Sequence, residues 1–470
     1  MSHSGRFALA CAISTVTLTV RVGAGVFAPG HLGELTQQVP FEMVDEVLVA
    51  TGAVQRRVRL LPSRVVVYLL LAGALFAELG YVQVWGRLTA GLGGAQPVPA
   101  PSGAALTQAR RRLGVAPLKA LFELLRGPAA TLGGAVRWRG LLVCAVDGTV
   151  MSVADSPANR AAYPRQRGSA FPMLRLVAVV ACGTRSVLDA VFGPACGTGN
   201  GETAYAARLL GALGEQMIVL ADRGFAAGWL VKQIADTGAH LLIRVKNGRS
   251  APKLPVLHRL RDGSFISRHG GIKVRVIDAA IIVSTNAGDT TGSYRLITTL
   301  LDSGAYPATD LVRLYHQRWE IETAYLELKS SILGGRVLRA RTPAGTEQEV
   351  YALLIAYQAL RTAMADATNS DPCIDPDRAG FSTALAAARD QVVQAAGVIA
   401  DTSIDLIGRI GRAVLDNLLP DRRVRINART VKRAISKYNA RGPVIDRTTY
   451  QATIAINVLT PTNSTAAKDP

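Results

Sequence analysis

The order of short apolar segments between residues 136 and 246 constrains the fold of this chain more than any other feature. Apolar runs separated by Gly, Pro and polar turns predict strands at 141–146, 174–181, 187–192, 217–221 and 241–245. Two segments between them, 202–213 and 226–236, are predicted to be helical. The resulting order, β-β-β-α-β-α-β, predicts an α/β unit built on one mixed sheet.

Two aspartates follow predicted buried strands directly. Asp147 comes after the run 141–146, and Asp222 comes after the run 217–221 and before Arg223. Either aspartate alone is better explained as a cap of the next helix or loop. Two carboxylates at the ends of neighbouring buried strands repel each other, however, and cations between them relieve that repulsion. Both aspartates also occur where the ribonuclease-H-like fold, which has this element order, brings acidic residues to one edge of a mixed sheet.

A third acid lies in the segment 309–333, which is predicted to be one helix. Counted from Tyr315, Arg318, Glu322 and Lys329 stand at i+3, i+7 and i+14, so the four side chains line one stripe. A second stripe is apolar and is expected to pack against the sheet: Leu314, Ile321, Tyr325, Leu328 and Ile332. An ordinary surface ladder of ion pairs is the alternative, and the two preceding aspartates favour a shared site instead.

Three carboxylates and two cations suit metal-dependent phosphodiester chemistry. In-line cleavage requires charge to be stabilised on both the attacking and the leaving oxygen, which two Mg²⁺ ions about 4 Å apart achieve on hard carboxylate ligands. The chain has only 6 His, and His316 is expected to face away from the acids, so no His-rich metal site is predicted. Arg318 is expected to clamp a phosphate in bidentate fashion, and Lys329 to act as a point charge.

The charge balance favours a polyanionic partner. The chain has 53 Lys and Arg against 34 Asp and Glu, a formal net charge of +19. Nucleic acid is the leading candidate, because each neutralised phosphate releases counterions, and an anionic membrane is the second. Lys246, at a predicted strand end, either contacts DNA or is simply solvated. Basic pI values also occur in ribosome-associated and in merely soluble proteins, so charge alone does not decide.

Basic residues concentrate in the two terminal parts of the chain. Residues 32–90 are predicted to be helical, with a cluster at Arg56, Arg57 and Arg59, and a linker at 91–103 precedes a helix with the arginine run 110–112. The segment 421–441 contains eight Arg or Lys and one acid. These segments predict DNA-binding elements. A solvated basic helix face is an equal alternative for the N-terminal segments and a weaker one for 421–441.

Cysteine usage and apolar runs indicate the compartment. The 5 cysteines are scattered without a paired motif, which argues against a disulfide framework or zinc ribbon and fits a reducing cytoplasm. The run 7–20 is diluted by Ser and Thr and lacks a clean cleavage site for a signal peptide. The run 65–77 is shorter than the roughly 20 residues of a membrane span and predicts a buried helix. We therefore expect a cytoplasmic protein, nucleoid-associated when bound, without a membrane partner.

These motifs resemble those of one family, the bacterial insertion-sequence DDE transposases of the insertion-element-four group. The signature of that group, Tyr-x2-Arg-x3-Glu-x6-Lys, is matched at every position by Tyr315, Arg318, Glu322 and Lys329. The sequences Val-Asp-Gly-Thr at 146–149 and Ala-Asp-Arg-Gly-Phe at 221–225 are similar to its flanking motifs. A long segment, predicted to be β-rich, separates Asp222 from Glu322 where that group carries its insertion.

The resemblance implies a function and assigns the site. Such an enzyme binds terminal inverted repeats, cleaves with two Mg²⁺ ions, and joins the free 3′-hydroxyls to target DNA as a homodimer; we expect Mn²⁺ to substitute. Asp147, Asp222 and Glu322 would be the catalytic and metal-binding residues. The expected DNA contacts are Tyr315, Arg318, Lys329, Lys246 and Arg223. A decayed copy that binds DNA without cutting, or a structure-selective nuclease on the same fold, is the alternative.

One step seen in some members of the group stays open for this chain. Those members form a hairpin at the transposon end and hold a flipped base on an aromatic residue of the insertion. The 4 Trp of this chain, at 85, 138, 229 and 319, lie outside the insertion. Phe265 or Tyr294 would have to take that role.

The predicted fold class is α/β, a ribonuclease-H-like mixed sheet with a β-rich insertion, an N-terminal helical domain and a helical, basic C-terminal region. We divide the chain into an N-terminal extension (1–31), a helical DNA-binding domain (32–135), a first part of the core (136–246), the insertion (247–307), a second part of the core with C-terminal helices (308–400), and a basic C-terminal segment and tail (401–470).

Overall fold

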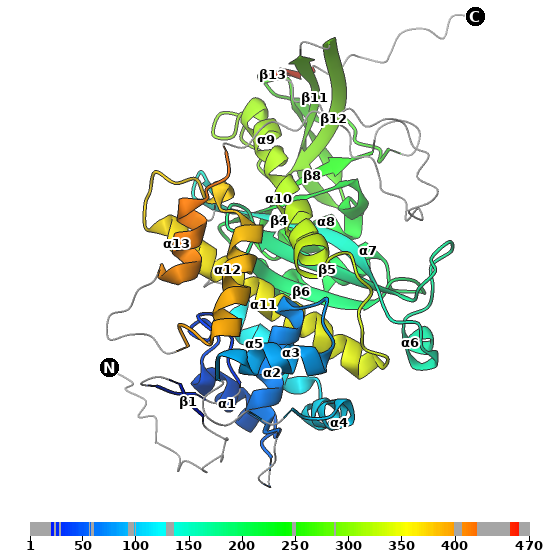
Figure 1. The fold of residues 1–470 in the computed structure, drawn as a ribbon. Helices are drawn as coiled ribbons and strands as arrows, with labels where there is room; N and C mark the ends of the chain where they lie inside the picture. Colours follow the sequence, from blue (N-terminus) through cyan, green and yellow to red (C-terminus); the bar gives the residue numbers. More distant parts are fainter. Residues whose placement is uncertain are drawn as a thin grey trace, which may run out of the picture.

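A large mixed β-sheet with helices on both faces forms the centre of the molecule (Figure 1). The computed structural model describes residues 20–22, 25–27, 30–55, 57, 61–92, 98, 100–127, 136–246, 251–285, 288–398, 407–420 and 452–459. The basic segment 421–441 and the tail 460–470 lie outside the described residues, as does most of the extension 1–31.

Five strands of the sheet correspond to the five predicted between residues 136 and 246. They are β4 (Leu141–Ser152), β5 (Met173–Ala181), β6 (Val187–Pro194), β7 (Met217–Ala221) and β8 (His240–Val245). β4 pairs antiparallel with β5 and parallel with β7, while β6 and β8 pair with the outer sides of these two strands. The spatial order β6-β5-β4-β7-β8 is that of the ribonuclease-H-like fold, so the predicted fold class is confirmed.

Alternate residues of β4 enter two hydrophobic cores. Val143 and Ala145 face one core, together with α10 (Trp319–Leu326) and α11 (Pro343–Asn369). Cys144 and Val146 face the other, together with α7 (Glu202–Ala207) and α8 (Gly228–Asp236). Both faces of the strand are therefore apolar, which explains why residues 141–146 read as a continuous apolar run rather than an alternating one.

The predicted β-rich insertion continues this sheet. Its strands are β9 (His258–Arg259), β10 (Phe265–His269), β11 (Ile272–Thr285) and β12 (Gly288–Thr298). β12 pairs antiparallel with β8 and joins the insertion to the core. Residues 288–292 of β12 pair with β11 and form the distal part of this hairpin. β13 (Ala452–Val458), which was not predicted, pairs with residues 279–285 of β11.

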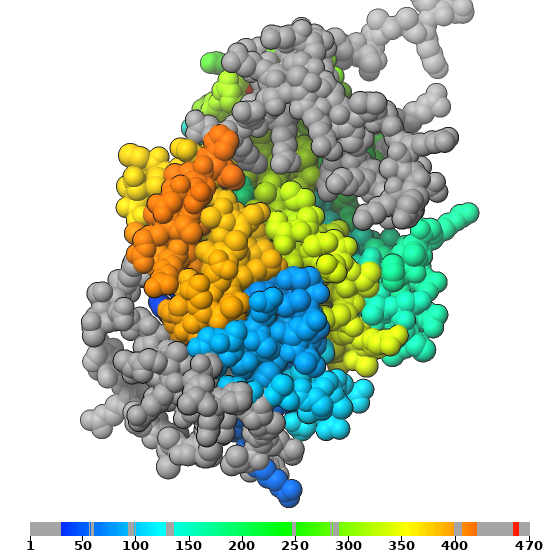
Figure 2. Space-filling view, viewed as in Figure 1, coloured from blue at the N-terminus to red at the C-terminus, as the bar shows by residue number. Residues whose placement is uncertain are grey.

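The N-terminal region is helical, as predicted, and packs on α11. Its helices are α1 (Phe41–Ala50), α2 (Ser63–Leu75), α3 (Tyr81–Thr89), α4 (Gly103–Leu113) and α5 (Ala116–Leu125). Every residue of α2 from Val65 to Leu75 is buried, which confirms the predicted buried helix. In the part of the chain that the structure describes, no helix is long and apolar enough to cross a membrane. Figure 2 shows the surface of α3 next to that of α12 (Phe381–Gln394).

The segment predicted as one helix over 309–333 consists of four pieces. α9 (Ala308–Tyr315) is followed by a 3-10 turn (His316–Arg318), by α10, and by a π-helical segment (Glu327–Ile332). All five residues of the predicted apolar stripe are buried, so the face that contacts the sheet was predicted correctly. The prediction of a single regular helix was wrong, because apolar periodicity does not reveal local changes of hydrogen-bond register.

Candidate active site

The strand register brings the two aspartates together. The parallel pairing of β4 with β7 ends at the pair Val146 and Ala221, and Asp147 and Asp222 are the next residues on the two strands. The strand was predicted to end just before Asp147, and this was wrong. β4 continues through Asp147 to Ser152 and stays paired with β5. Only its parallel neighbour β7 stops there. Neighbouring strands lie about 4.8 Å apart, so the two backbones leave the last shared pair side by side.

Asp147 is half-buried. Its Oδ1 accepts a hydrogen bond from the backbone N–H of Gly148 at 2.8 Å. Burial raises the pKa of Asp147 to about 6, opposed by that hydrogen bond and by Arg318, whereas the charges of Glu322 and Glu202 raise it further. Asp222 is half-buried, and its Oδ1 accepts from the backbone N–H of Arg223 at 2.7 Å.

Arg318 lies among the three acids. Its Nη2 donates to Oε1 of Glu322 at 3.0 Å, and both side chains are largely buried. Burial alone would lower the pKa of Arg318, but the neighbouring groups together raise it: Tyr315, Glu322, Asp222 and Asp147. The guanidinium therefore supplies a positive charge that relieves the repulsion between the carboxylates.

The other residues of the signature connect the helical segment to the two acid-bearing strands. The Tyr315 hydroxyl donates to the carbonyl oxygen of Ala221, the residue before Asp222, at 3.2 Å. The ammonium of Lys329 donates to Oγ1 of Thr149, two residues after Asp147, at 3.1 Å. Tyr315 is buried, and Lys329 is half-buried. The four signature residues thus gather at one place, although the segment that carries them is not one regular helix.

Two residues that sequence reasoning did not assign to the site also contact it. The Tyr325 hydroxyl donates to the carbonyl oxygen of Asp147 at 2.6 Å and accepts from the N–H of Ala178 at 3.0 Å. We expected Tyr325 only in the apolar stripe. Its hydroxyl gives α10 a fixed contact with both β4 and β5, so Tyr325 positions the backbone of Asp147.

Glu202, the first residue of α7, places a fourth carboxylate beside the aspartates. A Cβ added at Gly148 would come within 2.8 Å of the Glu202 side chain, and one at Gly224 would lie 3.8 Å from its Oε2. Arg175 holds the opposite oxygen, with Nη1 2.5 Å from Oε1. The sequence signal was the glycine after each aspartate motif, because only glycine admits a side chain this close to the backbone.

The remaining predicted contacts lie at different depths. Arg223, next to Asp222, and Lys246, after the end of β8, are both exposed. Tyr294 is half-buried; its ring is 6.4 Å from that of Tyr315, and Arg244 lies over it at 4.3 Å. Phe265 is only 3% exposed and belongs to the core beneath β8. The suggestion that Phe265 could hold a flipped base is therefore wrong, whereas Tyr294 lies beside the candidate site.

The chemistry of the donor set fits a divalent cation. Asp147, Asp222 and Glu322 offer only hard carboxylate oxygens, the ligands that Mg²⁺ prefers. Within the described residues, no three His, Cys, Asp or Glu side chains are already arranged around a common metal position. In this conformation the Arg318 guanidinium donates to Oε1 of Glu322, so a metal that takes this oxygen as a ligand must displace that contact.

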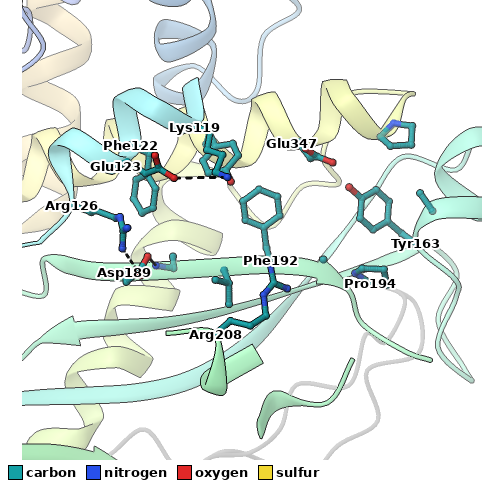
Figure 3. A pocket seen from close by; sticks show the side chains of 16 residues that line it. Lys119, Phe122, Glu123, Arg126, Tyr163, Asp189, Phe192, Pro194, Arg208 and Glu347 are labelled. Atoms are coloured by element: carbon teal, nitrogen blue, oxygen red, sulfur yellow. Dashed lines mark hydrogen bonds and ion pairs between the residues drawn. The ribbon is translucent and has the colours of Figure 1, made fainter. Parts of the chain in front are cut away.

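A cavity of about 620 Å³ lies away from these acids, between α5, β6 and the start of α11 (Figure 3). Its charged lining is balanced, with Lys119, Arg126 and Arg208 against Glu123, Asp189 and Glu347. Arg126 is paired with Asp189 inside it. No triad member lines this cavity, and its balanced charge gives no preference for an anion.

Comparisons with known proteins agree with the geometry. A family model described as insertion element 4 transposase N-terminal matches residues 29–123, and one described as transposase DDE domain matches residues 138–359. The chain is 27% identical over 407 residues to the Escherichia coli transposase InsG for insertion sequence element IS4, covering 84% of this chain and 91% of that protein.

Two further similarities are more distant. The chain is 28% identical over 214 residues to the putative transposase InsZ of Escherichia coli, covering 43% of this chain and 68% of InsZ. A cryo-EM structure of the piggyBac transposase synaptic complex with hairpin DNA superimposes with a TM-score of 0.41 at 10% identity. That match covers 82% of this chain and 84% of the piggyBac chain.

Proposed function

The chain belongs to the insertion element 4 family of DDE transposases, and from that premise we propose that it binds the terminal inverted repeats of its own element, cleaves DNA there, and joins the ends to target DNA. The observation that carries this proposal is the strand register at Val146 and Ala221. It sets Asp147 and Asp222 side by side, opposite the segment that carries Glu322.

In this proposal the three carboxylates are the metal ligands. In-line phosphodiester cleavage needs charge stabilised on the attacking and leaving oxygens, which is the chemistry that a pair of bound Mg²⁺ ions supplies. Asp147, Asp222 and Glu322 would hold them, and Mn²⁺ would substitute because it accepts the same oxygen donors. Glu202 adds negative charge beside both aspartates and, held by Arg175, keeps its carboxylate oriented towards them.

The cations around the acids would bind the DNA backbone. Arg318 would release Glu322 and bind a phosphate once metal ions supply the positive charge that Arg318 now provides. Its planar guanidinium suits a bidentate contact. Lys329 adds a point charge near Thr149. The exposed Arg223 and Lys246 lie at the ends of β7 and β8, where they would contact the flanking backbone. Tyr315 keeps the segment in register through Ala221.

Assembly and location follow the same proposal. Concerted joining of two ends requires two active sites on one piece of target DNA, so we propose a homodimer in the DNA complex. Its partners are double-stranded inverted repeats and target DNA, and its place is the cytoplasm with the nucleoid.

The experiment that tests this function combines cleavage and joining in one reaction. The wild-type chain is incubated with Mg²⁺, a labelled duplex that carries the end of its element, and a supercoiled plasmid as target. We expect nicked end DNA and labelled plasmid, both abolished by chelation of Mg²⁺. Binding without cleavage would identify an inactive DNA-binding protein, and cleavage without joining a nuclease; either result would overturn the proposal.

A further inference from the structure

A second cavity, of about 400 Å³, lies between the end of α4 and the start of α11, and all its charged lining residues are arginines: Arg110, Arg111, Arg339 and Arg341. We propose that this arginine cavity binds backbone phosphate of the transposon-end DNA, at a distance from the cleaved bond. This inference rests on the proposed function, because that function supplies the DNA.

The charge of the arginine cavity is unbalanced. Among the residues that the structure describes, no acidic side chain lines it, whereas the cavity of Figure 3 has equal numbers of acidic and basic side chains. Arg339 is already neutralised, because its Nε lies 2.7 Å from Glu349 and its two terminal nitrogens donate to the carbonyls of Leu79 and Gly73. Three arginine charges therefore face the cavity uncompensated by its lining. Gathering like charges in this way costs free energy that a bound anion recovers.

Arg110 is held rigidly at the wall of the cavity. Its Cζ lies 4.1 Å from the centre of the Tyr81 ring, and a Cβ added at Gly345 would lie 3.5 Å from its Nη2. Gln348 fixes the backbone below it, with Nε2 donating to the carbonyl of Arg110 at 2.9 Å. Within the described residues, the buried Nε of Arg110 has no hydrogen-bond acceptor. Leaving a buried donor without an acceptor costs free energy, and a phosphate oxygen beside the Arg110 guanidinium would supply an acceptor.

The first turn of α11 adds to the attraction. α11 is 27 residues long and begins at Pro343, capped by the Thr342 hydroxyl, which accepts from the N–H of Gly345. Thr342 and Gly345 both line the arginine cavity. The positive end of a helix dipole favours an anion, and here it acts in the same direction as the arginines.

The fold sets the distance from this cavity to the acids. β4 runs from Asp147 to Ser152, and the next residue, Val153, bridges to Leu338, three residues before Arg341. Asp147, Met151 and Val153 alternate on one face of the strand, the face covered by α10 and α11. Six residues of extended strand span about 20 Å. A duplex that extends from the acids towards the cavity would present a phosphate to it about six base pairs from the cleaved bond.

A double-mutant cycle between protein and DNA tests the inference. Arg111 and Arg341 are exposed, so their substitution by Gln leaves the core intact. The DNA partner is the element-end duplex with neutral methylphosphonates placed about five to seven nucleotides from the cleaved bond. We expect Arg341→Gln to weaken binding of the unmodified duplex about tenfold. The salt dependence of log Kd should also lose about one unit of slope per arginine removed.

The decisive result is non-additivity. If the arginine cavity holds that phosphate, the methylphosphonates weaken DNA binding by the wild-type chain about tenfold. They hardly change DNA binding by the Arg111→Gln/Arg341→Gln chain. Arg112→Gln removes the same charge from the same helix outside the cavity lining, so its coupling to the modified phosphates should be much smaller. Equal, additive losses in wild type and variant would overturn the inference. The proposed function would survive that result if the wild-type chain still cleaved and joined the unmodified end.

Discussion

Burial of Asp147 sets the electrostatic character of the site. This half-buried carboxylate loses part of its hydration, and the nearby Glu322 and Glu202 add like charge. The Gly148 N–H and the charge of Arg318 compensate part of this cost. A divalent cation at this position would stabilise the ionised form of Asp147, which its half-buried environment disfavours.

This burial predicts a pH-dependent gain of stability in Asp147→Asn. The folded-state pKa of Asp147 is about 6 against an ordinary value of 3.8, so the protonated form is favoured by folding. Its contribution to stability is present below about pH 4 and lost as the pH rises through about 6. In denaturant titrations without divalent ions, the Asn variant should be more stable than wild type by about 1–3 kcal/mol above pH 7. Near pH 4 the free energies of unfolding of the two proteins should coincide. A variant that is less stable than wild type both near pH 4 and above pH 7 would contradict this account.

For single residues, the sequence identifies those site residues that adjoin a recognisable local pattern. Asp147 and Asp222 follow apolar runs, and Glu322 has cationic neighbours at fixed spacing. Glu202 and Tyr325 reach the site only through tertiary contacts, across Gly148 and along the Asp147 backbone. No spacing along the chain encodes such an approach, so these two were missed.

The element that carries Glu322 is fixed by a buried ionic network. Arg185, in the turn between β5 and β6, contacts Glu320 at 2.6 Å, Glu327 at 3.2 Å and Asp377 at 2.7 Å. Glu327, which begins the π-helical segment, also pairs with Arg361 and accepts from the Tyr357 hydroxyl at 3.1 Å. Glu320 and Glu327 flank Glu322, so the network determines how this segment is rotated over the sheet.

Removing the centre of that network should destabilise the fold strongly. Arg185→Ala leaves the buried carboxylates of Glu320 and Glu327 short of a partner, and breaking a buried ion pair costs about 3–5 kcal/mol. Urea denaturation measures this loss. Arg313→Ala is the matched control, because Arg313 pairs with Asp310 at the surface of α9, where such a pair contributes at most about 1 kcal/mol. Similar losses in the two variants would show that the network does not stabilise the segment.

The sequence predicts the existence and buried face of this element but not its internal geometry. Apolar residues recur through 309–333 with a helical period, so one helix was the natural interpretation. The change from α to 3-10 to π geometry depends on where Arg185, Arg361 and the sheet hold individual side chains. Those partners come from distant parts of the chain, and no local charge pattern indicates which residues pair.

Across the whole molecule, one sheet connects the acid-bearing core to the insertion. Apolar runs separated by turn residues indicate the five core strands and their order. It does not indicate that β12 pairs with β8, or that β13 returns from residues 452–458 to cover β11. Such long-range pairings leave no local pattern beyond ordinary strand propensity.

Deleting residues 452–470 should therefore expose an edge strand. β10 covers residues 272–276 of β11 and β13 covers residues 279–285 of the same edge. Without β13, the open backbone groups of β11 are available to pair with a second copy, and we expect self-association visible by light scattering. Deletion of residues 460–470 alone leaves β13 in place and serves as the control. Equal monodispersity of both truncated chains would show that β13 does not protect this edge.

The most direct test of the central claim is metal-dependent cleavage of an element-end duplex by wild type and by Glu322→Gln. Gln keeps the size of the side chain and removes the charge that a metal ion requires. We predict that the variant binds the duplex in the presence of a chelator as tightly as wild type does, while its Mg²⁺-dependent cleavage falls about a thousandfold or more. Cleavage by Glu322→Gln at the wild-type rate would contradict the assignment of Asp147, Asp222 and Glu322 as one metal-binding site.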